Sequence, residues 1–349
     1  MDLSLSGLAP IDAVRALCDD PGSLTLVAQP IADLATGAVA GWEALSRAPT
    51  AWGVAPDDLF AAARRHGLSS RLESIVVQRA MDLLDLLPPD TFLTVNVDPV
   101  DVGVPEVMGP MLDRPSLARL VVEVTEHAWP RDRERVTRGL DLLRARGAVV
   151  AADDVGAGYA GLTHLMRLRP KIVKLDRELI ADLGTDPAAE ALVRSLGHLC
   201  GTLDAWVVAE GVETVAQLDA LVRLGVPLAQ GWLLGRPAEP WTGLADPGLL
   251  TDHVATGRRS GTLAGLVVPL PPGYRRDDLG RWHHVEDPEP VATFAPTTTV
   301  REAVDRSLAR QPRQRWDPLL VTDGTGAAIG IVLPETLVAA ALHHDASPA

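Results

Sequence analysis

Cysteine, lysine and aromatic residues are scarce in this sequence of 349 residues. The only cysteines are Cys18 and Cys200, and two thiols so far apart provide neither a disulfide framework nor the spacing of a metal–thiolate site. This use of cysteine is typical of a reducing cytoplasm. Aromatic residues make up 4% of the chain and hydrophobic residues 47%, so the core must be built from Ala, Val and Leu.

Long apolar segments are also missing. No run approaches the roughly 20 apolar residues of a transmembrane helix, and the first residues lack the positive charge and apolar middle of a secretory signal. The formal net charge of −14 argues against polymeric nucleic acid or a membrane as a partner, because both need a basic protein face. We therefore expect a cytoplasmic protein. A small anionic ligand is compatible with this charge if metal ions and a few basic residues reverse the field locally.

Strand-like and helix-like segments alternate between about residues 23 and 237. The runs LTLVAQPI and AVAGWEAL, joined by a short polar turn, predict a hairpin. The later strand-like runs are short, Val-rich and apolar on both faces, as in a covered parallel sheet. About eight such strands with helices between them predict an α/β fold of the (β/α)8 barrel type, with the hairpin as a departure from the all-parallel pattern. An open doubly wound sheet is the alternative, but no Gly-rich phosphate loop follows the first strand.

The composition of the chain changes beyond this alternating region, which divides the sequence into four segments. We predict a helical lead-in over residues 1–22, the barrel over 23–245, an irregular linker rich in Pro, Gly and charge over 246–290, and a small α/β segment over 291–345. The last segment has the pattern helix, strand, Asp-Gly turn, strand, helix, and is too small to bury much core alone. Within the barrel, residues 69–87 have helical spacing, with Ser69 or Ser70 as the expected N-cap.

Acidic or amide residues recur at the downstream ends of the strand-like runs. They are Glu43, Asn96, Glu123, Asp153, Asp154, Glu210 and Gln230. In a barrel these strand ends meet at the face that carries active sites. Oxygen ligands without His or Cys favour Mg²⁺ or Mn²⁺ over zinc. The pattern therefore predicts a divalent-cation site for chemistry on phosphates, although a single Glu near a strand end is more often a solvated rim residue.

Two further features have both a functional and a structural explanation. Asp153 and Asp154 are adjacent, so a cation would keep both ionised; the alternative is an Asp pair that caps a short helix. The chain has 30 arginines but only two lysines, Lys171 and Lys174, which suggests that Lys174 supplies a compact ammonium to orient water or offset phosphate charge. The alternative is a Lys171/Lys174 pair on a solvated strand edge. Arg47 follows Glu43 closely enough to reach a phosphate.

Seven motifs, in the expected order, resemble the signature of the EAL-domain cyclic di-GMP phosphodiesterases. They are GWEALSR (41–47), VNVDP around Asn96, VEVTE ending at Glu126, DDVGAGYAGL from Asp153, IVKLD around Lys174, AEGVET (209–214) and QGWLLGRP from Gln230. The resemblance covers about Leu24 to Pro237. It implies a modified TIM barrel with one antiparallel strand, and hydrolysis of one phosphodiester of cyclic di-GMP to linear pGpG with two Mg²⁺ or Mn²⁺ ions, in second-messenger signalling.

The resemblance also implies a role for each matching residue. Glu43, Asn96, Glu123 and Asp153 match the ligands of one ion, and Asp153, Asp154 and Glu210 match those of the other. The remaining matches are Lys174 and Gln230, which position or polarise the water, Glu213 as a supporting acid, Glu126 as a stabiliser of the loop after the paired aspartates, and Arg47, Gln29 and Asp154 as substrate contacts.

The sequence departs from the family pattern in the loop that begins at Val155, where the family usually has Phe. The family uses this loop in dimerisation and regulation, so we expect a homodimer with a more loosely anchored loop. A catalytically weak cyclic di-GMP receptor and a protein-binding scaffold are the alternatives to an enzyme.

The tail, from about residue 296 to 342, resembles a single CBS repeat, which implies an adenine nucleotide ligand. CBS repeats normally work in pairs, so either two chains pair their tails or an irregular earlier stretch supplies the second half. A purely structural appendage is a further alternative.

Overall fold

The computed structural model describes residues 7–125, 132–156, 165, 168–250, 262–277, 281–285, 289–311, 314–323 and 326–344. Two compact units account for the chain. The first consists of Met1–Gln29, Trp42–Val150 and Pro237–Thr242, and the second of Pro30–Gly41, Ala151–Arg236 and Gly243–Ala349.

Eight strands are hydrogen-bonded in chain order and close into a barrel. They are β1 (Thr25–Asp33), β2 (Val39–Arg47), β3 (Phe92–Asn96), β4 (Leu120–Thr125), β5 (Val149–Val155), β6 (Ile172–Leu175), β7 (Trp206–Ala209) and β8 (Leu228–Ala229). Neighbours from β5 to β8 pair in parallel, as do β3 and β4. Strand β1 pairs antiparallel with β8. This arrangement confirms the predicted barrel and its one antiparallel strand.

The antiparallel strand follows from the short turn between β1 and β2. The Asp33 carboxylate accepts a hydrogen bond from the backbone N–H of Ala35 at 2.7 Å, and Gly37 has a φ of +76°, which glycine adopts without steric cost. A turn this short reverses the chain, so β1 and β2 run in opposite directions. The predicted hairpin is therefore the feature that separates this barrel from an all-parallel one.

Five α-helices of the described residues belong to the first unit. They are α1 (Pro10–Asp19), α2 (Pro56–Arg65), α3 (Ser69–Leu84), α4 (Pro105–Leu112) and α5 (Arg133–Ala145), together with the short 3₁₀ helices η1 (Pro21–Ser23) and η2 (Thr50–Trp52). The serine N-cap predicted for α3 is wrong. Leu68 occupies the N-cap position without a side-chain hydrogen bond, and the Ser70 hydroxyl instead donates to the carboxylate of Asp101. A tertiary contact has replaced the local one.

Three described helices in the barrel part of the second unit begin at polar residues that cap them. They are α7 (Arg177–Ala181), α8 (Pro187–Thr202) and α9 (Val215–Arg223). The side chains of Asp176, Asp186 and Thr214 each accept a hydrogen bond from a backbone N–H in the first turn. Thr214 and Gln217 form a reciprocal capping box at α9. The caps of α7 and α9 lie shortly after the ends of β6 and β7 and so fix the path of the chain beyond these two strands.

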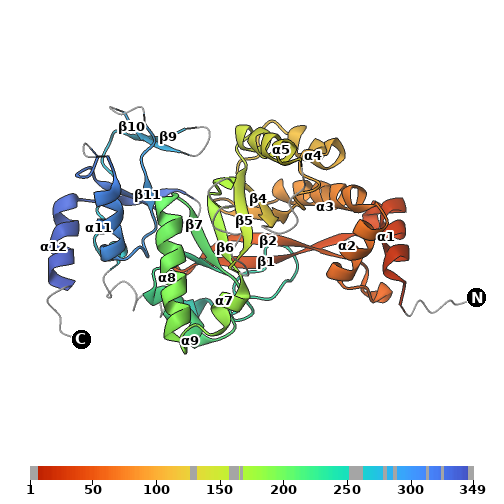
Figure 1. Cartoon of the computed structure of the whole chain (residues 1–349), viewed down its shortest axis with the longest axis horizontal. Helices are drawn as coiled ribbons and strands as arrows, with labels where there is room; N and C mark the ends of the chain where they lie inside the picture. Colours follow the sequence, from red (N-terminus) through yellow and green to blue (C-terminus); the bar gives the residue numbers. More distant parts are fainter. Residues whose placement is uncertain are drawn as a thin grey trace, which may run out of the picture. The chain divides into compact units, whose positions relative to one another are not determined.

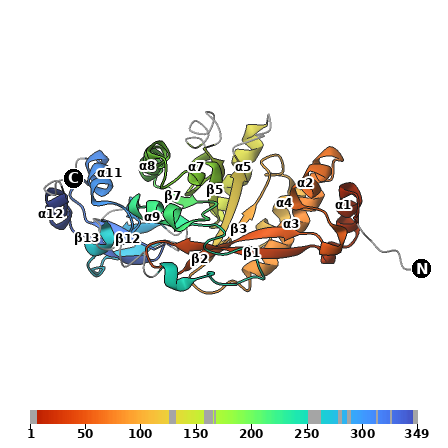
Figure 2. The same cartoon turned by 90° about the horizontal axis from the view of Figure 1, so that it is seen from below.

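The tail forms a small α/β segment with its own core. Its elements are η3 (Leu263–Gly265), β9 (Tyr274–Arg276), β10 (Trp282–His284), β11 (Thr293–Phe294), α11 (Val300–Ala309), β12 (Leu319–Thr322), β13 (Ala328–Val332) and α12 (Pro334–His344). The sheet has the order β11-β12-β13, and α11 and α12 cover one of its faces (Figures 1 and 2). The helix, strand, strand, helix order agrees with the prediction. The β9–β10 hairpin lies in the stretch that we expected to be irregular.

Helix α11 runs beside α8 within the second unit (Figures 1 and 2). Two glycines lie where the tail meets the rest of the second unit. A Cβ atom on Gly201 would lie 3.0 Å from both Glu302 Oε1 and Arg306 Cδ, and one on Gly225 would lie 2.5 Å from the carbonyl oxygen of Thr297. An added Cβ on Gly225 would therefore clash with the backbone of the tail, whereas at Gly201 the contacting atoms belong to the side chains of Glu302 and Arg306.

Within the residues that the structure describes, no helix combines the length and apolar character needed to cross a membrane.

Candidate metal centre

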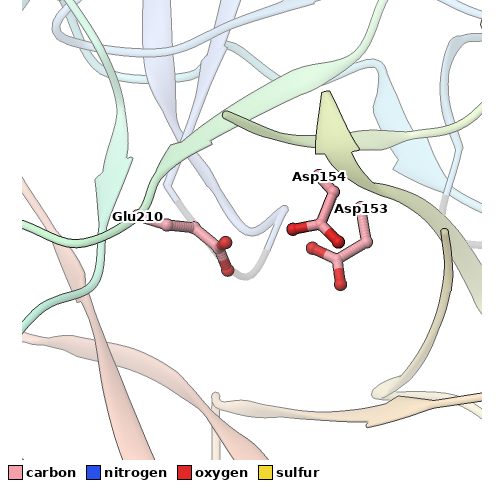
Figure 3. A group of neighbouring side chains, drawn as sticks. All are labelled: Asp153, Asp154 and Glu210. Atoms are coloured by element: carbon pink, nitrogen blue, oxygen red, sulfur yellow. The ribbon is translucent and has the colours of Figure 1, made fainter. Parts of the chain in front are cut away.

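Three carboxylates of the second unit converge on one point. Asp153 and Asp154 come at the end of β5, and Glu210 directly follows β7. One carboxylate oxygen from each lies within 4.8 Å of the others, and the three side chains point toward a common space (Figure 3). Asp153 is buried, and the other two are partly buried. This grouping matches the acids that the sequence predicts for one ion.

An irregularity at the end of β5 lets two adjacent residues serve one site. In a regular strand, successive side chains point to opposite faces. Here the pairing of β5 with β6 shifts register between Ala152 and Val155, and Asp154 has a φ of +57°. This left-handed conformation is rare outside glycine, although Asp tolerates it better than most residues. The backbone turn redirects Asp154, so both carboxylates face Glu210.

Lys174 lies within this carboxylate group. It is in β6 with only 1% of its surface exposed, and its Nζ is 2.6 Å from Glu210 Oε1 and 3.3 Å from Asp153 Oδ1. Lys171, in contrast, is exposed and pairs with Asp204. The alternative in which both lysines lie on a solvated edge is therefore wrong for Lys174. A buried ammonium is tolerated because carboxylates surround it.

The donor set suits a hard divalent cation. Asp153 Oδ1 is buried and accepts no hydrogen bond from the described residues, although the Lys174 ammonium is near. Three carboxylates in ionised form carry more negative charge than one ammonium offsets, and carboxylate oxygens are the ligands that Mg²⁺ and Mn²⁺ prefer. The residues present therefore fit such an ion.

Backbone hydrogen bonds position Glu210 and Gln230. The Glu210 N–H donates to Leu175 O at 3.1 Å, the Gln230 N–H donates to Ala209 O at 2.8 Å, and the Gln230 carbonyl accepts from Val212 N at 3.1 Å. A Cβ on Gly231 would lie 2.2 Å from Val212 N, so only glycine allows this close approach. Gln230 is 4% exposed.

A separate group of predicted ligands lies in the first unit. Glu43 in β2 is 7% exposed, and its Oε1 accepts a hydrogen bond of 2.7 Å from the Asn96 amide at the end of β3. Glu123 in β4 is 1% exposed and is the register partner of Asn96. The backbone N–H of Val97 donates to the Glu123 carbonyl at 3.0 Å. Three neighbouring strands thus present the predicted ligands Glu43, Asn96 and Glu123.

The other predicted site residues lie outside these two groups or outside the described residues. Arg47 ends β2 with its Nη1 donating to the Ser46 carbonyl at 2.8 Å, and Gln29 is buried in β1. Glu213 is exposed just before α9, where its backbone N–H donates to Gln217 Oε1. Glu126, and the loop residues that follow Gly156 up to residue 164, lie outside the described residues. Val155 itself is buried at the end of β5.

Three buried acids among the described residues were not predicted site residues: Asp33, which closes the turn between β1 and β2, and the pair Glu73 and Asp101. Glu73 in α3 and Asp101 after β3 are 5% and 3% exposed. The sequence carried one signal for Glu73, because it interrupts the apolar face of the helix pattern LESIVV. Asp101 gave no comparable signal, since an Asp in a loop is ordinarily solvated.

Comparison with known proteins gives consistent matches over the barrel. MucR of Pseudomonas aeruginosa, named a bifunctional diguanylate cyclase/cyclic di-GMP phosphodiesterase, is 42% identical over 120 residues, which cover 34% of this chain and 18% of MucR. PdeG of Escherichia coli, named a probable cyclic di-GMP phosphodiesterase, is 28% identical over 227 residues, covering 62% of this chain and 45% of PdeG. The chain thus spans less than half the length of these curated relatives.

Solved structures match as well. The PaMucR phosphodiesterase in complex with cyclic di-GMP has a TM-score of 0.58 and 32% identity, covering 67% of this chain and 98% of that chain. BlrP1 of Klebsiella pneumoniae, in a complex with calcium and cyclic di-GMP, has a TM-score of 0.57 and 33% identity, covering 64% of this chain and 58% of that chain. Another BlrP1 structure contains manganese and cyclic di-GMP.

The family assignment rests on a family-model match and not on any single relative. The EAL domain family matches residues 12–237, which is more than half of the chain and includes all eight barrel strands. The chain belongs to the EAL domain family.

Proposed function

We propose that this chain is a metal-dependent phosphodiesterase that hydrolyses cyclic di-GMP to linear pGpG. The observation that carries the proposal is the convergence of Asp153, Asp154 and Glu210 around the buried ammonium of Lys174. The names of MucR and PdeG and the cyclic di-GMP complexes of PaMucR and BlrP1 support the choice of substrate. The calcium and manganese in the BlrP1 complexes support a divalent ion.

The proposed ligands divide between two ions. Asp153, Asp154 and Glu210 would hold one of them. Glu43, Asn96 and Glu123, with Asp153 as the shared ligand, would hold the other; this assignment comes from the sequence motifs. Bound there, two Mg²⁺ or Mn²⁺ ions would supply activation of water and stabilisation of the leaving oxygen in an in-line displacement.

The protein's own groups would orient the reactants. The Lys174 ammonium is held by two carboxylates, so it can donate to an attacking water or offset charge on the phosphate. Gln230, fixed by its backbone hydrogen bonds, would orient the same water, with Glu213 as a supporting acid. Arg47 and Gln29 would contact the substrate, and a guanidinium suits phosphate because it offers paired donors. Glu126 would steady the loop after Asp154.

The test is a hydrolysis assay on cyclic di-GMP with Mg²⁺ or Mn²⁺, run beside Glu43→Gln. The amide has the shape of the acid but removes the charge that a cation needs, so we expect the wild type to yield pGpG and the variant to yield none. Asp141→Asn, on the exposed face of α5, makes an equivalent loss of charge away from the site and should hydrolyse like the wild type. A wild type that binds cyclic di-GMP without product would favour a receptor, and one that does not bind it would favour a scaffold.

Three other features stay predictions of the sequence. They are a cytoplasmic location, a homodimer, and an adenine nucleotide bound by a CBS-like tail. Calorimetry with AMP and ATP tests the last of these, since the absence of heat with either nucleotide would leave the tail as a packing element.

A further inference from the structure

Behind β3 in the first unit lies a pair of buried carboxyl groups that the proposed reaction does not use. Glu73 projects from α3, and Asp101 belongs to the segment between β3 and α4. The two residues are 5% and 3% exposed, and their carboxyl groups are within hydrogen-bond reach of each other. Two acids in contact inside a protein require an explanation, because burial and mutual repulsion both disfavour the ionised forms.

Two of the four carboxyl oxygens of this pair accept hydrogen bonds from neighbouring residues. Glu73 Oε1 accepts a hydrogen bond of 2.7 Å from the backbone N–H of Asp98, and Asp101 Oδ1 accepts one from the Ser70 hydroxyl. The other two oxygens, Glu73 Oε2 and Asp101 Oδ2, are buried and receive no hydrogen bond from the described residues. A proton held between the two carboxyl groups lets one acid donate to the other, which reduces the number of buried acceptors that lack a donor.

The surroundings favour Glu73 as the group that keeps this proton. Burial raises the pKa of Glu73 well above its usual range, and the contact with Asp101 acts in the same direction, whereas the hydrogen bond from Asp98 N–H lowers it.

Within the part of the chain that the structure describes, the elements around Glu73 bring no cation into contact with it. The Arg64 guanidinium, from α2, lies 3.7 Å from the Asp98 carboxylate, and Arg135, from α5, donates to the Val100 carbonyl at 2.7 Å. Ser70 is the polar neighbour on α3, and it is uncharged. The charged groups that face Glu73 are therefore Asp98 and Asp101, both negative.

The backbone held by Glu73 is the segment that follows Asn96. Val97 N–H donates to the Glu123 carbonyl on one side, and Asp98 N–H donates to Glu73 on the other. Asn96 in turn donates its amide to Glu43 at 2.7 Å. The backbone after Asn96 is thus held at two successive residues, at Val97 by the proposed ligand Glu123 and at Asp98 by Glu73. Asn96 directly precedes this segment and is bonded to the proposed ligand Glu43.

We propose that Glu73, in its neutral form, is a positioning residue that fixes the end of β3 and thereby the orientation of Asn96 toward Glu43. The consequence for catalysis rests on the proposed phosphodiesterase function, whereas the anchoring of the segment does not. Glu73 touches neither metal nor substrate in this scheme. It acts through the Asp98 N–H and through the proton that it shares with Asp101.

Two substitutions separate this role from simple filling of the core. Glu73→Gln keeps an oxygen acceptor for the Asp98 N–H and offers an N–H to Asp101, so it imitates the neutral acid. Glu73→Leu fills a similar volume but leaves the Asp98 N–H and Asp101 Oδ2 buried without partners. We expect Glu73→Gln to retain wild-type kcat at neutral pH and Glu73→Leu to lower kcat by roughly ten- to a hundredfold. The KM for cyclic di-GMP should change less, because the substrate contacts are untouched. Glu106→Leu, at an exposed position of α4, controls for the loss of a negative charge nearby.

The pH dependence provides a readout that core filling would not move. Because the folded-state pKa of Glu73 is raised above the ordinary 4.5, its contribution to stability is complete below that value and is lost as pH rises through the folded-state pKa. The thermal midpoint of the wild type should therefore fall relative to that of Glu73→Gln as the pH increases. If Glu73→Leu fails to fold, the comparison of thermal midpoints between wild type and Glu73→Gln still tests the proposal. Thermal midpoints that change with pH in parallel for these two proteins would overturn it.

Amide hydrogen exchange over residues 92–104 tests the anchoring role of Glu73 without relying on phosphodiesterase activity. Glu73→Leu should exchange faster than wild type in this segment, and Glu73→Gln should not. If the wild type shows no hydrolysis but the exchange and pH results are as expected, the phosphodiesterase function fails and the anchoring role stands. If Glu73→Leu exchanges and turns over like the wild type, the anchoring role is wrong.

Discussion

The ammonium of Lys174 lies 2.6 Å from Glu210 Oε1 and 3.3 Å from Asp153 Oδ1, and the residue as a whole is 1% exposed. One cation of the protein therefore contacts two of the three carboxylates proposed to hold a metal ion. Such a contact has two consequences. It neutralises part of the buried negative charge, and it fixes the ammonium where a phosphate or an attacking water would meet the metal ligands.

Replacing Lys174 by Met should destabilise the protein. The side chain keeps a similar length but leaves buried carboxylates without their cation, which costs about 3–5 kcal/mol in comparable buried pairs. We expect a lower free energy of unfolding in urea with EDTA present. Added Mn²⁺ should recover more of that loss in Lys174→Met than in the wild type, because the ion then replaces the missing positive charge.

The matched control uses the other lysine. Lys171→Met removes an exposed pair with Asp204, so its free energy of unfolding should stay within about 1 kcal/mol of the wild type. Equal losses for the two variants would contradict the assignment of Lys174 as the buried counter-ion.

Removing one of the three carboxylates should weaken metal binding, and this effect can be measured without an activity assay. Asp153→Asn preserves shape but removes a charge from the group of three. Mutation of a residue that only orients a metal ligand lowers metal affinity by about 10–100-fold. Loss of a direct ligand should therefore lower the affinity for Mn²⁺ by roughly a hundredfold or more. Calorimetric titration with Mn²⁺ measures this, beside Asp141→Asn as the exposed control. Unchanged Mn²⁺ affinity in Asp153→Asn would show that the ion binds elsewhere.

The barrel itself was predictable because its signals are local. Alternating strand-like and helix-like segments, and the turn around Asp33 and Gly37, are encoded within short stretches of chain. The acids at the strand ends were likewise visible, since parallel strands deliver their carboxyl ends to the same face.

The features that escaped prediction depend on contacts distant in sequence. The φ of +57° at Asp154 coincides with a register shift against β6, and no local sequence pattern indicates either feature. Ser70 has the residue type of an N-cap but donates to Asp101, 31 residues away. The β9–β10 hairpin lies in a Pro- and Gly-rich stretch, and Trp282 Nε1 anchors it by donating to the Gly326 carbonyl 44 residues later. In each case a tertiary contact outweighed local preference.

The two thiols should differ in reactivity, although both are slow. Burial raises the pKa of the Cys200 thiol to about 12, and the nearby Glu302 carboxylate acts in the same direction. Burial also raises the pKa of Cys18, which is less enclosed. Because only the thiolate reacts, titration with an aromatic disulfide at pH 8 should modify Cys18 slowly and Cys200 only after unfolding. The variants Cys18→Ser and Cys200→Ser identify which thiol reacts, and rapid native labelling of Cys18→Ser would contradict the burial of Cys200.

Packing of the tail on the rest of the second unit should depend on Gly225. Its φ is +73°, and an added Cβ would lie 2.5 Å from the Thr297 carbonyl oxygen, so Gly225→Ala meets both backbone strain and a clash with the tail. We expect a loss of about 1–2 kcal/mol from the conformation alone. Hydrogen exchange over residues 296–303 should accelerate as the tail moves away.

Gly197→Ala is the matched control, because Gly197 lies inside α8 with nothing within 4 Å of an added Cβ. That variant should gain roughly 0.5–1 kcal/mol from better helix propensity and leave exchange in the tail unchanged. If both alanine variants behaved alike, the close approach of Gly225 to Thr297 would not contribute to holding the tail in place. A selective effect of Gly225→Ala on tail exchange, with the barrel segments unaffected, would identify this glycine as a determinant of tail docking.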